Sequence, residues 1–230
     1  MSQLFCQNRF RVAIANKGCA KALVGIPVRR ATETESHPPS LQCTFGPEIN
    51  LQPMNPVLQR LEAELARSLR GLTGIETQVY PHHNPDRWNI CQIVQHLQLS
   101  YTATISSLEE RVAKKRPTRS RATPSQLLAR FFVLGLGVIP VRREAPEITI
   151  PPAQASKPLP TGDMLISSIS QMLNNLDKAF DNAEGYFHSS PCLSHFALGP
   201  LSIPQWRRFH LVHGRHHIRQ IIAIRHEYRL

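Results

Sequence analysis

This sequence predicts an all-α fold: a four-helix bundle with an elaborated, partly helical connection between helices two and three. Three observations support this class. Four long stretches carry apolar residues at spacings of three and four, as the buried side of a helix does. Few stretches alternate with the period of two that marks strands. Hydrophobic residues make up 41% of the 230 residues and charged residues 19%, which is the composition of a globular chain.

The first helix is predicted over residues 55–72, where leucines recur at spacings of 3, 4, 4 and 3. Asn55 is a suitable N-cap, and Pro56 fits the first helical position. Gly71 and Gly74 end the helix, because glycine readily adopts the backbone conformation that follows one. The leucines of this stripe are Leu58, Leu61, Leu65, Leu69 and Leu72.

A loop over residues 80–87 precedes the second predicted helix, residues 88–113. Apolar residues at helical spacing give this segment one buried side. The helix ends before a cluster of lysine and arginine and before Pro117, which cannot continue it. The residues expected on the buried side are Ile90, Ile93, Val94, Leu97, Tyr101, Ile105 and Leu108.

Residues 114–161 form the expected connection, and its length means that helices two and three need not be simple hairpin neighbours. Nine Lys or Arg and no acidic residue lie within 111–143, and six prolines lie within 140–160. Pro124 can begin a helix that carries the apolar run 127–140. This run is shorter than the roughly 20 residues that span a bilayer, so we expect a buried helix, with an interfacial anchor as the alternative.

The third long helix is predicted to begin after Thr161, a good N-cap, and to extend past Phe180. A loop over 189–202 follows. Ser202 then caps a last helix, with Pro204 in its first turn, that runs to about Glu227. Packing these four amphipathic helices against one another is what predicts a bundle.

We divide the chain into a poorly ordered N-terminal extension, 1–53, and a bundle domain, 54–230. The first 32 residues hold six basic side chains and no acidic one, as a transit peptide would. A start codon assigned too early would explain the extension equally well, because Met54 directly precedes the first helical pattern. Lys17 and Lys21 interrupt any apolar core of a secretory signal.

The cysteines and the charge restrict the function classes. None of the five cysteines forms a C-x-x-C pair, so we expect free thiols in a reducing compartment and a cytoplasmic protein. The net charge of +11 admits nucleic acid, a membrane surface or an anionic small molecule as partners. Against nucleic acid, aromatic residues are only 7% and no recognition motif is present. The basic run 111–121 could attract an anionic cosubstrate or could simply be a solvated loop.

Histidines point to a metal site. The chain has eleven, and five lie in the last helix. His213 and His217 are four residues apart on the side that a bundle would bury, so their imidazoles can converge on one divalent ion. A third ligand must come from another helix. His96 lies near the apolar side of the second helix, where an unsatisfied imidazole would be costly to bury.

The same spacing has an ordinary alternative, in which the histidine pair bonds to carbonyls or water and holds no metal. The sequence excludes one class of metal-dependent enzyme, the zinc proteases with the motif H-E-x-x-H. Gly214 stands where the zinc-protease motif H-E-x-x-H has its glutamate, so the general base of those enzymes is missing. Nor does the sequence identify another general base or a nucleophile. Cys91 lies on a different part of its helix from His96.

Two segments carry a family resemblance. Residues 87–97 read RWNICQIVQHL, and residues 195–221 read HFALGPLSIPQWRRFHLVHGRHHIRQI. Together they resemble the DinB-like (YfiT-like) superfamily of metal-dependent proteins, whose name refers to damage-inducible bacterial proteins. Residues 127–146, LLARFFVLGLGVIPVRREAP, resemble an uncharacterised subgroup. The resemblance extends over about residues 55–225.

The resemblance implies a four-helix bundle with a central histidine triad, carried over here to His96, His213 and His217. It implies a zinc, nickel or other first-row divalent ion with an open coordination position. By analogy with relatives, it implies a small-molecule substrate and a thiol-dependent S-transferase, with a low-molecular-weight thiol as cosubstrate, or a metal-assisted hydrolase. A homodimer through exposed helix faces is compatible with it.

Residues around the triad are given ordinary roles. We expect Gln220 behind a ligand and His210 and His216 at exposed positions or behind ligands. We expect Trp88 and Trp206 to be core residues. His195 and Gly199 are expected to shape the loop before the last helix. The loop histidines His82 and His83 are expected on the surface. Three hypotheses therefore follow from the sequence: a metal-dependent enzyme, a non-catalytic metal-binding or stress-related bundle protein, and a basic nucleic-acid-binding protein.

Overall fold

The computed structural model describes residues 53–139, 147–152 and 158–230. Helices account for 67% of these residues, and the only sheet among them has two short strands. The prediction of an all-α protein is therefore confirmed. The extension predicted over 1–53 lies outside the described residues, apart from Pro53.

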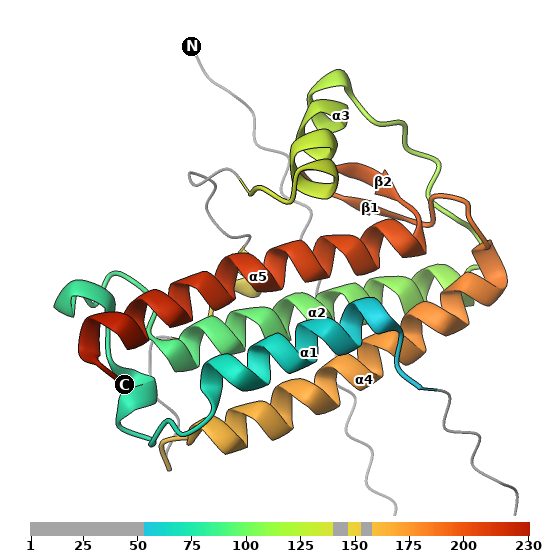
Figure 1. Cartoon of the computed structure of the whole chain (residues 1–230). Coiled ribbons are helices and arrows are strands. Elements are labelled where there is room, and N and C mark those ends of the chain that lie inside the picture. The colour runs from blue at the N-terminus through green and yellow to red at the C-terminus, as the bar shows by residue number, and fades with distance from the viewer. Residues whose placement is uncertain (1–52, 140–146, 153–157) are drawn as a thin grey trace, which may run out of the picture. The chain divides into compact units, whose positions relative to one another are not determined.

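Four long helices lie beside one another in Figure 1. They are α1 (Pro56–Leu69), α2 (Ile90–Ala113), α4 (Gly162–Phe187) and α5 (Ile203–Tyr228). The starts of α1, α4 and α5 agree with the predicted caps, whereas α2 begins two residues after the predicted residue 88. The Asn55 side chain accepts from the Val57 amide, the Thr161 side chain accepts from the Met164 amide, and Ser202 forms a capping box with Gln205.

Shorter elements occupy the connections. Single helical turns lie between α1 and α2, and a further one lies between α3 and α4. They are η1 (Glu76–Gln78), η2 (Pro81–His83) and η4 (Glu147–Thr149). The connection after α2 also holds α3 (Pro124–Arg130), which continues into a π-helical turn, η3 (Phe131–Gly135). Before α5, strands β1 (Leu193–His195) and β2 (Gly199–Leu201) pair antiparallel.

Helices α2 and α4 are successive long helices of the bundle. They run in the same direction and pack directly together. Gln98 bonds to Ser168, and one turn further along both helices Thr102 bonds to Met172. Because α2 has 24 residues, it is about 36 Å long, and the chain must return that distance before α4 begins. This requirement explains the length of the 114–161 connection.

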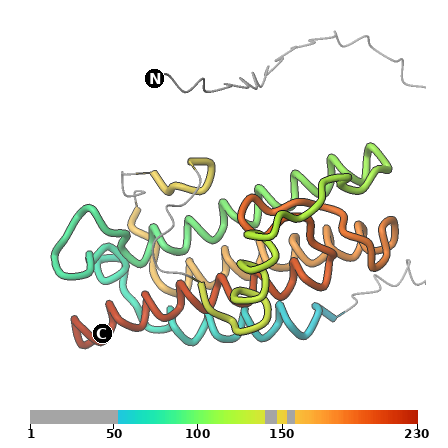
Figure 2. The backbone as a smooth tube through the Cα atoms, turned by 90° about the horizontal axis from the view of Figure 1, so that it is seen from above, coloured from blue at the N-terminus to red at the C-terminus, as the bar shows by residue number. Residues whose placement is uncertain are grey.

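Helices α1 and α5 form the second parallel pair, and they run opposite to α2 and α4 (Figures 1 and 2). Glu64 pairs with Arg215 at 2.6 Å, and further along both helices the Ser68 carbonyl accepts from Arg225 at 2.8 Å. The apolar sides of all four helices meet in one core. The leucines of the predicted α1 stripe lie in it, four of them with no exposed surface: Leu58, Leu61, Leu65 and Leu69.

An ion cluster around the buried Arg207 joins α4 to α5. Arg207 is only 5% exposed, and its guanidinium contacts Asp181 at 2.5 Å and Glu184 at 2.6 Å. Its Nε lies 3.5 Å from Asp177, whose other carboxylate oxygen accepts from the Asn55 amide at 2.7 Å. The cluster therefore connects the start of α1 to α4 and α5. The sequence alone had suggested no role for its acidic residues.

Helix α3 and η3 lie with the β1–β2 hairpin on one side of α5, and Figure 2 shows them from above. We call residues 124–139 together with this hairpin the cap. Arg130 holds its two parts together, because its guanidinium donates to the Leu198 carbonyl at 3.0 Å and to the Pro200 carbonyl at 2.8 Å. Gln126 adds a bond to the Phe196 carbonyl at 3.2 Å.

The expectation of a buried helix over 127–140 is wrong. No residue of α3 is buried, and in η3 only Val133 is. The segment is a single layer outside the long helices, so only its inner side packs and the outer apolar side chains stay accessible. The outer side chains, from 41% to 59% exposed, are Leu127, Leu128, Phe131, Phe132, Leu136 and Val138. Within the described residues, no helix is both long and apolar enough to cross a membrane.

Two glycines of α4 should respond oppositely to alanine. At Gly162 a Cβ would lie 2.0 Å from the Leu69 carbonyl oxygen, a backbone atom that cannot move aside cheaply. We expect Gly162→Ala to lower the free energy of unfolding by about 1–3 kcal/mol. Gly185 has open space around it, so Gly185→Ala should raise that free energy by about 0.5–1 kcal/mol through helix propensity. Urea unfolding measures both, and equal midpoints for the two variants would contradict the close packing of α1 on α4.

Candidate metal centre

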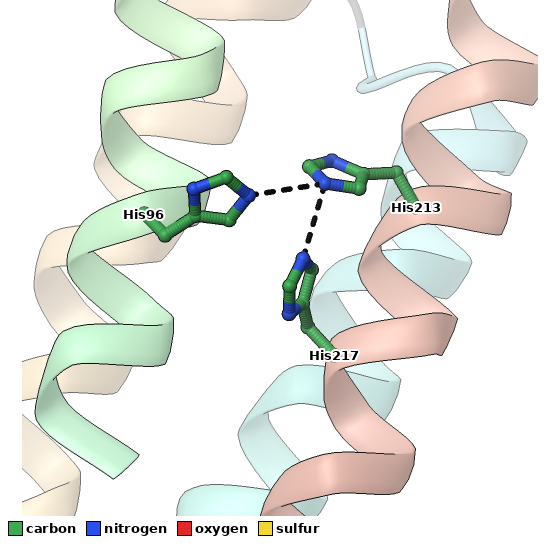
Figure 3. Close-up of side chains that lie close together, drawn as sticks. All are labelled: His96, His213 and His217. Carbon is green, nitrogen blue, oxygen red and sulfur yellow. Dashed lines mark hydrogen bonds between the residues drawn. The ribbon is translucent and has the colours of Figure 1, made fainter. Parts of the chain in front are cut away.

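Three histidines from two helices meet between α2 and α5 (Figure 3). His213 Nε2 lies 3.2 Å from His96 Nε2 and 3.1 Å from His217 Nε2. His96 and His217 are buried, and His213 is half-buried. All three offer ligand atoms within 4.8 Å of one another, so the cluster could hold a metal ion. The structure thus brings together the three residues named from the sequence.

The contacts of the outer ring nitrogens select the tautomers. His96 Nδ1 lies 2.7 Å from the Thr149 carbonyl oxygen, and His217 Nδ1 lies 2.9 Å from Gln220 Oε1. Both oxygens only accept, so both Nδ1 atoms carry the proton. The Nε2 atoms of His96 and His217 therefore present lone pairs to the shared point. This is how an outer hydrogen bond prepares an imidazole to bind a metal.

Burial keeps these imidazoles uncharged. Desolvation lowers the pKa of His96, lowers that of His213 well below its usual value, and lowers that of His217 to about 3. The neighbouring imidazoles act in the same direction. Metal ligation needs neutral imidazole, so at pH 7 the cluster does not have to lose protons first.

The backbone around the pair on α5 also depends on close packing. Gly214 follows His213, and a Cβ there would lie 2.4 Å from Leu61 Cδ1 of α1. Glycine therefore lets α1 pack closely against α5 beside the triad. On α2, the capping box of Asn89 and Gln92 begins the helix less than two turns before His96.

The triad forms part of the wall of a cavity of about 520 Å³ between α2, α5 and the cap. Its size falls in the range of small-molecule sites. Side chains from all these elements line it, together with two residues of the connection before α4. The aromatic and aliphatic residues among them include Trp88, Ala129, Val133, Ile139, Ile148, Leu193, Phe196, Leu198, Trp206 and Phe209.

The neighbours of the triad take varied positions. Gln220 lies behind His217 as expected, and its amide nitrogen also contacts His216 at 3.3 Å. His195 shapes the hairpin, where its Nδ1 accepts from the Ala197 amide, and it also lines the cavity. As expected, Trp206 lies in the core and Trp88 packs against it, and both also line the cavity. The Trp88 ring lies 4.7 Å from the His96 ring.

Several other residues lie away from the triad. His82 and His83 are exposed, as expected for a loop. Gly199 has a φ of 71°, which favours glycine, and sits in β2 at the hairpin. Cys91 is buried, and burial raises the pKa of its thiol, so a reactive thiolate is not formed there. No residue of the basic run 111–121 lines the cavity.

Two contributors were missed by sequence reasoning. Thr149 belongs to the connection, and no pattern connects its carbonyl with His96. His210 was expected to be exposed or behind a ligand, but it has no exposed surface and packs among Tyr101, Phe180 and Trp206. Neither of its ring nitrogens has a hydrogen-bond partner within the described part of the chain. The one sequence feature that pointed to His210 was its position three residues before His213 on the same helix.

The fold and this cluster define an all-α protein with a three-histidine site that could bind a metal ion. Residues 60–223 match the family described as Protein of unknown function (DUF1569), and the chain belongs to that family. No curated protein and no solved structure matches the chain.

The buried His210 should make metal-free protein sensitive to acid. Desolvation lowers its pKa from 6.5 to about 3, so between these values the unfolded chain binds a proton that the folded protein does not. Folding stability should fall with decreasing pH across this window by about 1.4 kcal/mol per pH unit for this histidine. His210→Phe, of similar size, should have a correspondingly flatter slope. Urea unfolding from pH 7 to 4 tests this, and equal slopes would contradict it.

Proposed function

We propose that this chain is a four-helix bundle of the DinB-like type and a divalent-metal-dependent enzyme, with His96, His213 and His217 as the metal ligands. The observation that carries the proposal is the tautomer selection at the triad. Two outer nitrogens are bound to acceptors, so two lone pairs converge beside His213. Without a cation, these lone pairs would face one another with at most one proton between them, which is unfavourable.

The cavity favours an enzyme over a protein that only stores or sequesters metal. Storage needs ligands but no adjoining space, whereas the triad here forms part of a wall with room for a small molecule. Three protein ligands also leave a coordination position open, as in catalytic sites. Zinc, nickel or another first-row divalent ion suits three imidazoles. Such an ion would lower the pKa of a water or thiol and so supply a nucleophile at neutral pH.

The chain's own residues would orient the metal ligands and shield the site. The Thr149 carbonyl and Gln220 would orient two imidazoles, while the cap would limit the access of water. Two reactions fit this arrangement: transfer of a low-molecular-weight thiol to an electrophile, and hydrolysis. The resemblance of residues 87–97 and 195–221 to DinB-like proteins supports both reactions. Neither reaction requires a side chain to act as a general base in addition to the metal site.

Metal binding is the first property to measure. We expect full-length protein, purified without a histidine tag, to bind about one equivalent of zinc or nickel, and His96→Ala and His213→Ala to lose at least about tenfold in affinity. Metal at a hundredfold excess over the parent's dissociation constant should stabilise the parent by about 2.7 kcal/mol and each variant by at most about 1.4 kcal/mol. Elemental analysis and thermal unfolding measure these effects.

His226→Ala is the matched control, because His226 is an exposed histidine on the same helix. It should bind metal like the parent. A parent protein that cannot be loaded with any of these ions, or a control that loses metal as the triad variants do, would refute the proposed site.

Catalysis is tested on the metal-loaded protein. We expect turnover of an activated aromatic ester for a hydrolase, or of an aromatic electrophile together with a thiol for a transferase. His217→Ala should reduce either rate by at least about a hundredfold, because it removes a ligand. Stoichiometric metal binding without turnover in either assay would favour the non-catalytic metal-binding protein instead.

A further inference from the structure

The cavity beside the triad differs from the rest of the protein in its charge. The chain carries a net charge of +11, yet no lysine, arginine, aspartate or glutamate is among the described residues that line the cavity. Arg130, the one lysine or arginine among the residues of the cap, directs its guanidinium to the hairpin carbonyls of Leu198 and Pro200. This cation is used to hold the cap together and is not offered to a ligand.

Apart from the histidines, the polar side chains of the wall are uncharged hydroxyls: Ser100, Thr104, Ser107, Thr149 and Ser194. Three of these side chains come from α2, one from η4 and one from β1. An anionic group placed away from the triad would therefore lose its hydration with no cation to replace it. Such a transfer is strongly unfavourable.

Aromatic rings surround the approach to the triad. The Phe209 ring stacks on His213 with an interplanar angle of 10° and a centroid distance of 5.3 Å. Trp88 lies against His96, and Trp206 lies edge-on to Phe209 at 5.6 Å. Phe196 of the hairpin completes this wall while remaining 61% exposed. Flat rings of this kind favour ligands that are themselves apolar and aromatic.

We propose that this cavity binds an uncharged, largely apolar and aromatic small molecule, seated with its one polar group at the histidine triad. The part of this inference that concerns the polar group rests on the proposed metal site, and the part that concerns the apolar body rests on the wall alone. It restricts the substrate class of the proposed enzyme. The body of the substrate lies against Val133 of the cap and against α2, and only its reacting end meets the three imidazoles.

Two fluorescent probes with the same ring systems test the charge preference. N-phenyl-1-naphthylamine is neutral, and 1-anilinonaphthalene-8-sulfonate adds one sulfonate to it. Titrated into metal-free full-length protein, the neutral probe should bind at one site and at least about tenfold more tightly than the sulfonate. Sulfonate binding as tight as, or tighter than, that of the neutral probe would overturn the inference, because it would show that the basic surface governs binding.

Variants that fill the cavity locate the neutral probe. Val133→Phe from the cap and Ser107→Phe from α2 each add bulk to the wall, and each should weaken its binding at least about tenfold. Leu136→Phe is the control, because Leu136 is 57% exposed and does not line the cavity. Two filling variants on separate elements keep the test decisive if one fails to fold. Unchanged binding in a folded filling variant would overturn the inference.

Cobalt-loaded protein tests the polar end. Adding 4-phenylimidazole, a neutral aromatic ligand with a metal-binding nitrogen, should change the visible spectrum of the ion in the parent and not in Val133→Phe, which should still bind cobalt. A spectral change of equal affinity in both proteins would overturn the seating. Failure to bind any metal, together with preserved selectivity for the neutral probe, would refute the proposed function while supporting the apolar cavity.

Discussion

The parallel packing of α2 against α4 constrains the rest of the structure. Two successive long helices that run the same way cannot be joined by a tight turn, so the chain must travel back along the helices before α4 begins. The returning segment contributes two features of the site. It supplies residues 124–139 of the cap that covers the cavity, and through η4 it places the Thr149 carbonyl on His96. A site between α2 and α5 thus depends on a contact between α2 and α4.

The triad uses burial and hydrogen bonding together. Desolvation removes the positive charge from the imidazoles, and acceptors on Nδ1 decide which nitrogen keeps its proton. Either effect alone would be incomplete, because an exposed triad would protonate near pH 6.5 and an unoriented one would not direct its lone pairs. The result is a cluster of neutral donors, which favours a cation as its occupant and links metal affinity to folding.

Charge is also separated by position in the fold. Five of the six basic residues of the run 111–121 are exposed, and none lines the cavity. Where a charged residue is buried, it is compensated: Arg207 by Asp177, Asp181 and Glu184. Net charge therefore describes the outside of this protein, and it gives little guide to what the cavity accepts. That difference explains why composition alone suggested anionic partners and the cavity wall suggests neutral ones.

Much of the fold follows from local patterns. The leucine stripe of α1, the caps at Asn55, Thr161 and Ser202, and the prolines beside them determine where the long helices begin and which side they bury, because these depend on neighbours within a few residues. Likewise, the spacing of His213 and His217 is a property of one helix. These features could be predicted without tertiary structure.

Other features depend on segments far apart in the chain. The apolar run 127–140 has the composition of a buried helix, and only the place of residues 127–139 outside the long helices leaves most of their apolar side chains accessible. His210 and His213 share a helix, yet packing against Tyr101 and Phe180 buries one, while the cavity leaves the other half-accessible. The sequence by itself determined the helices and the residue types that could bind a metal. Only tertiary structure decided which nitrogens face one another and what surrounds them, because the burial comes from other segments and the Thr149 carbonyl that binds His96 lies 53 positions away.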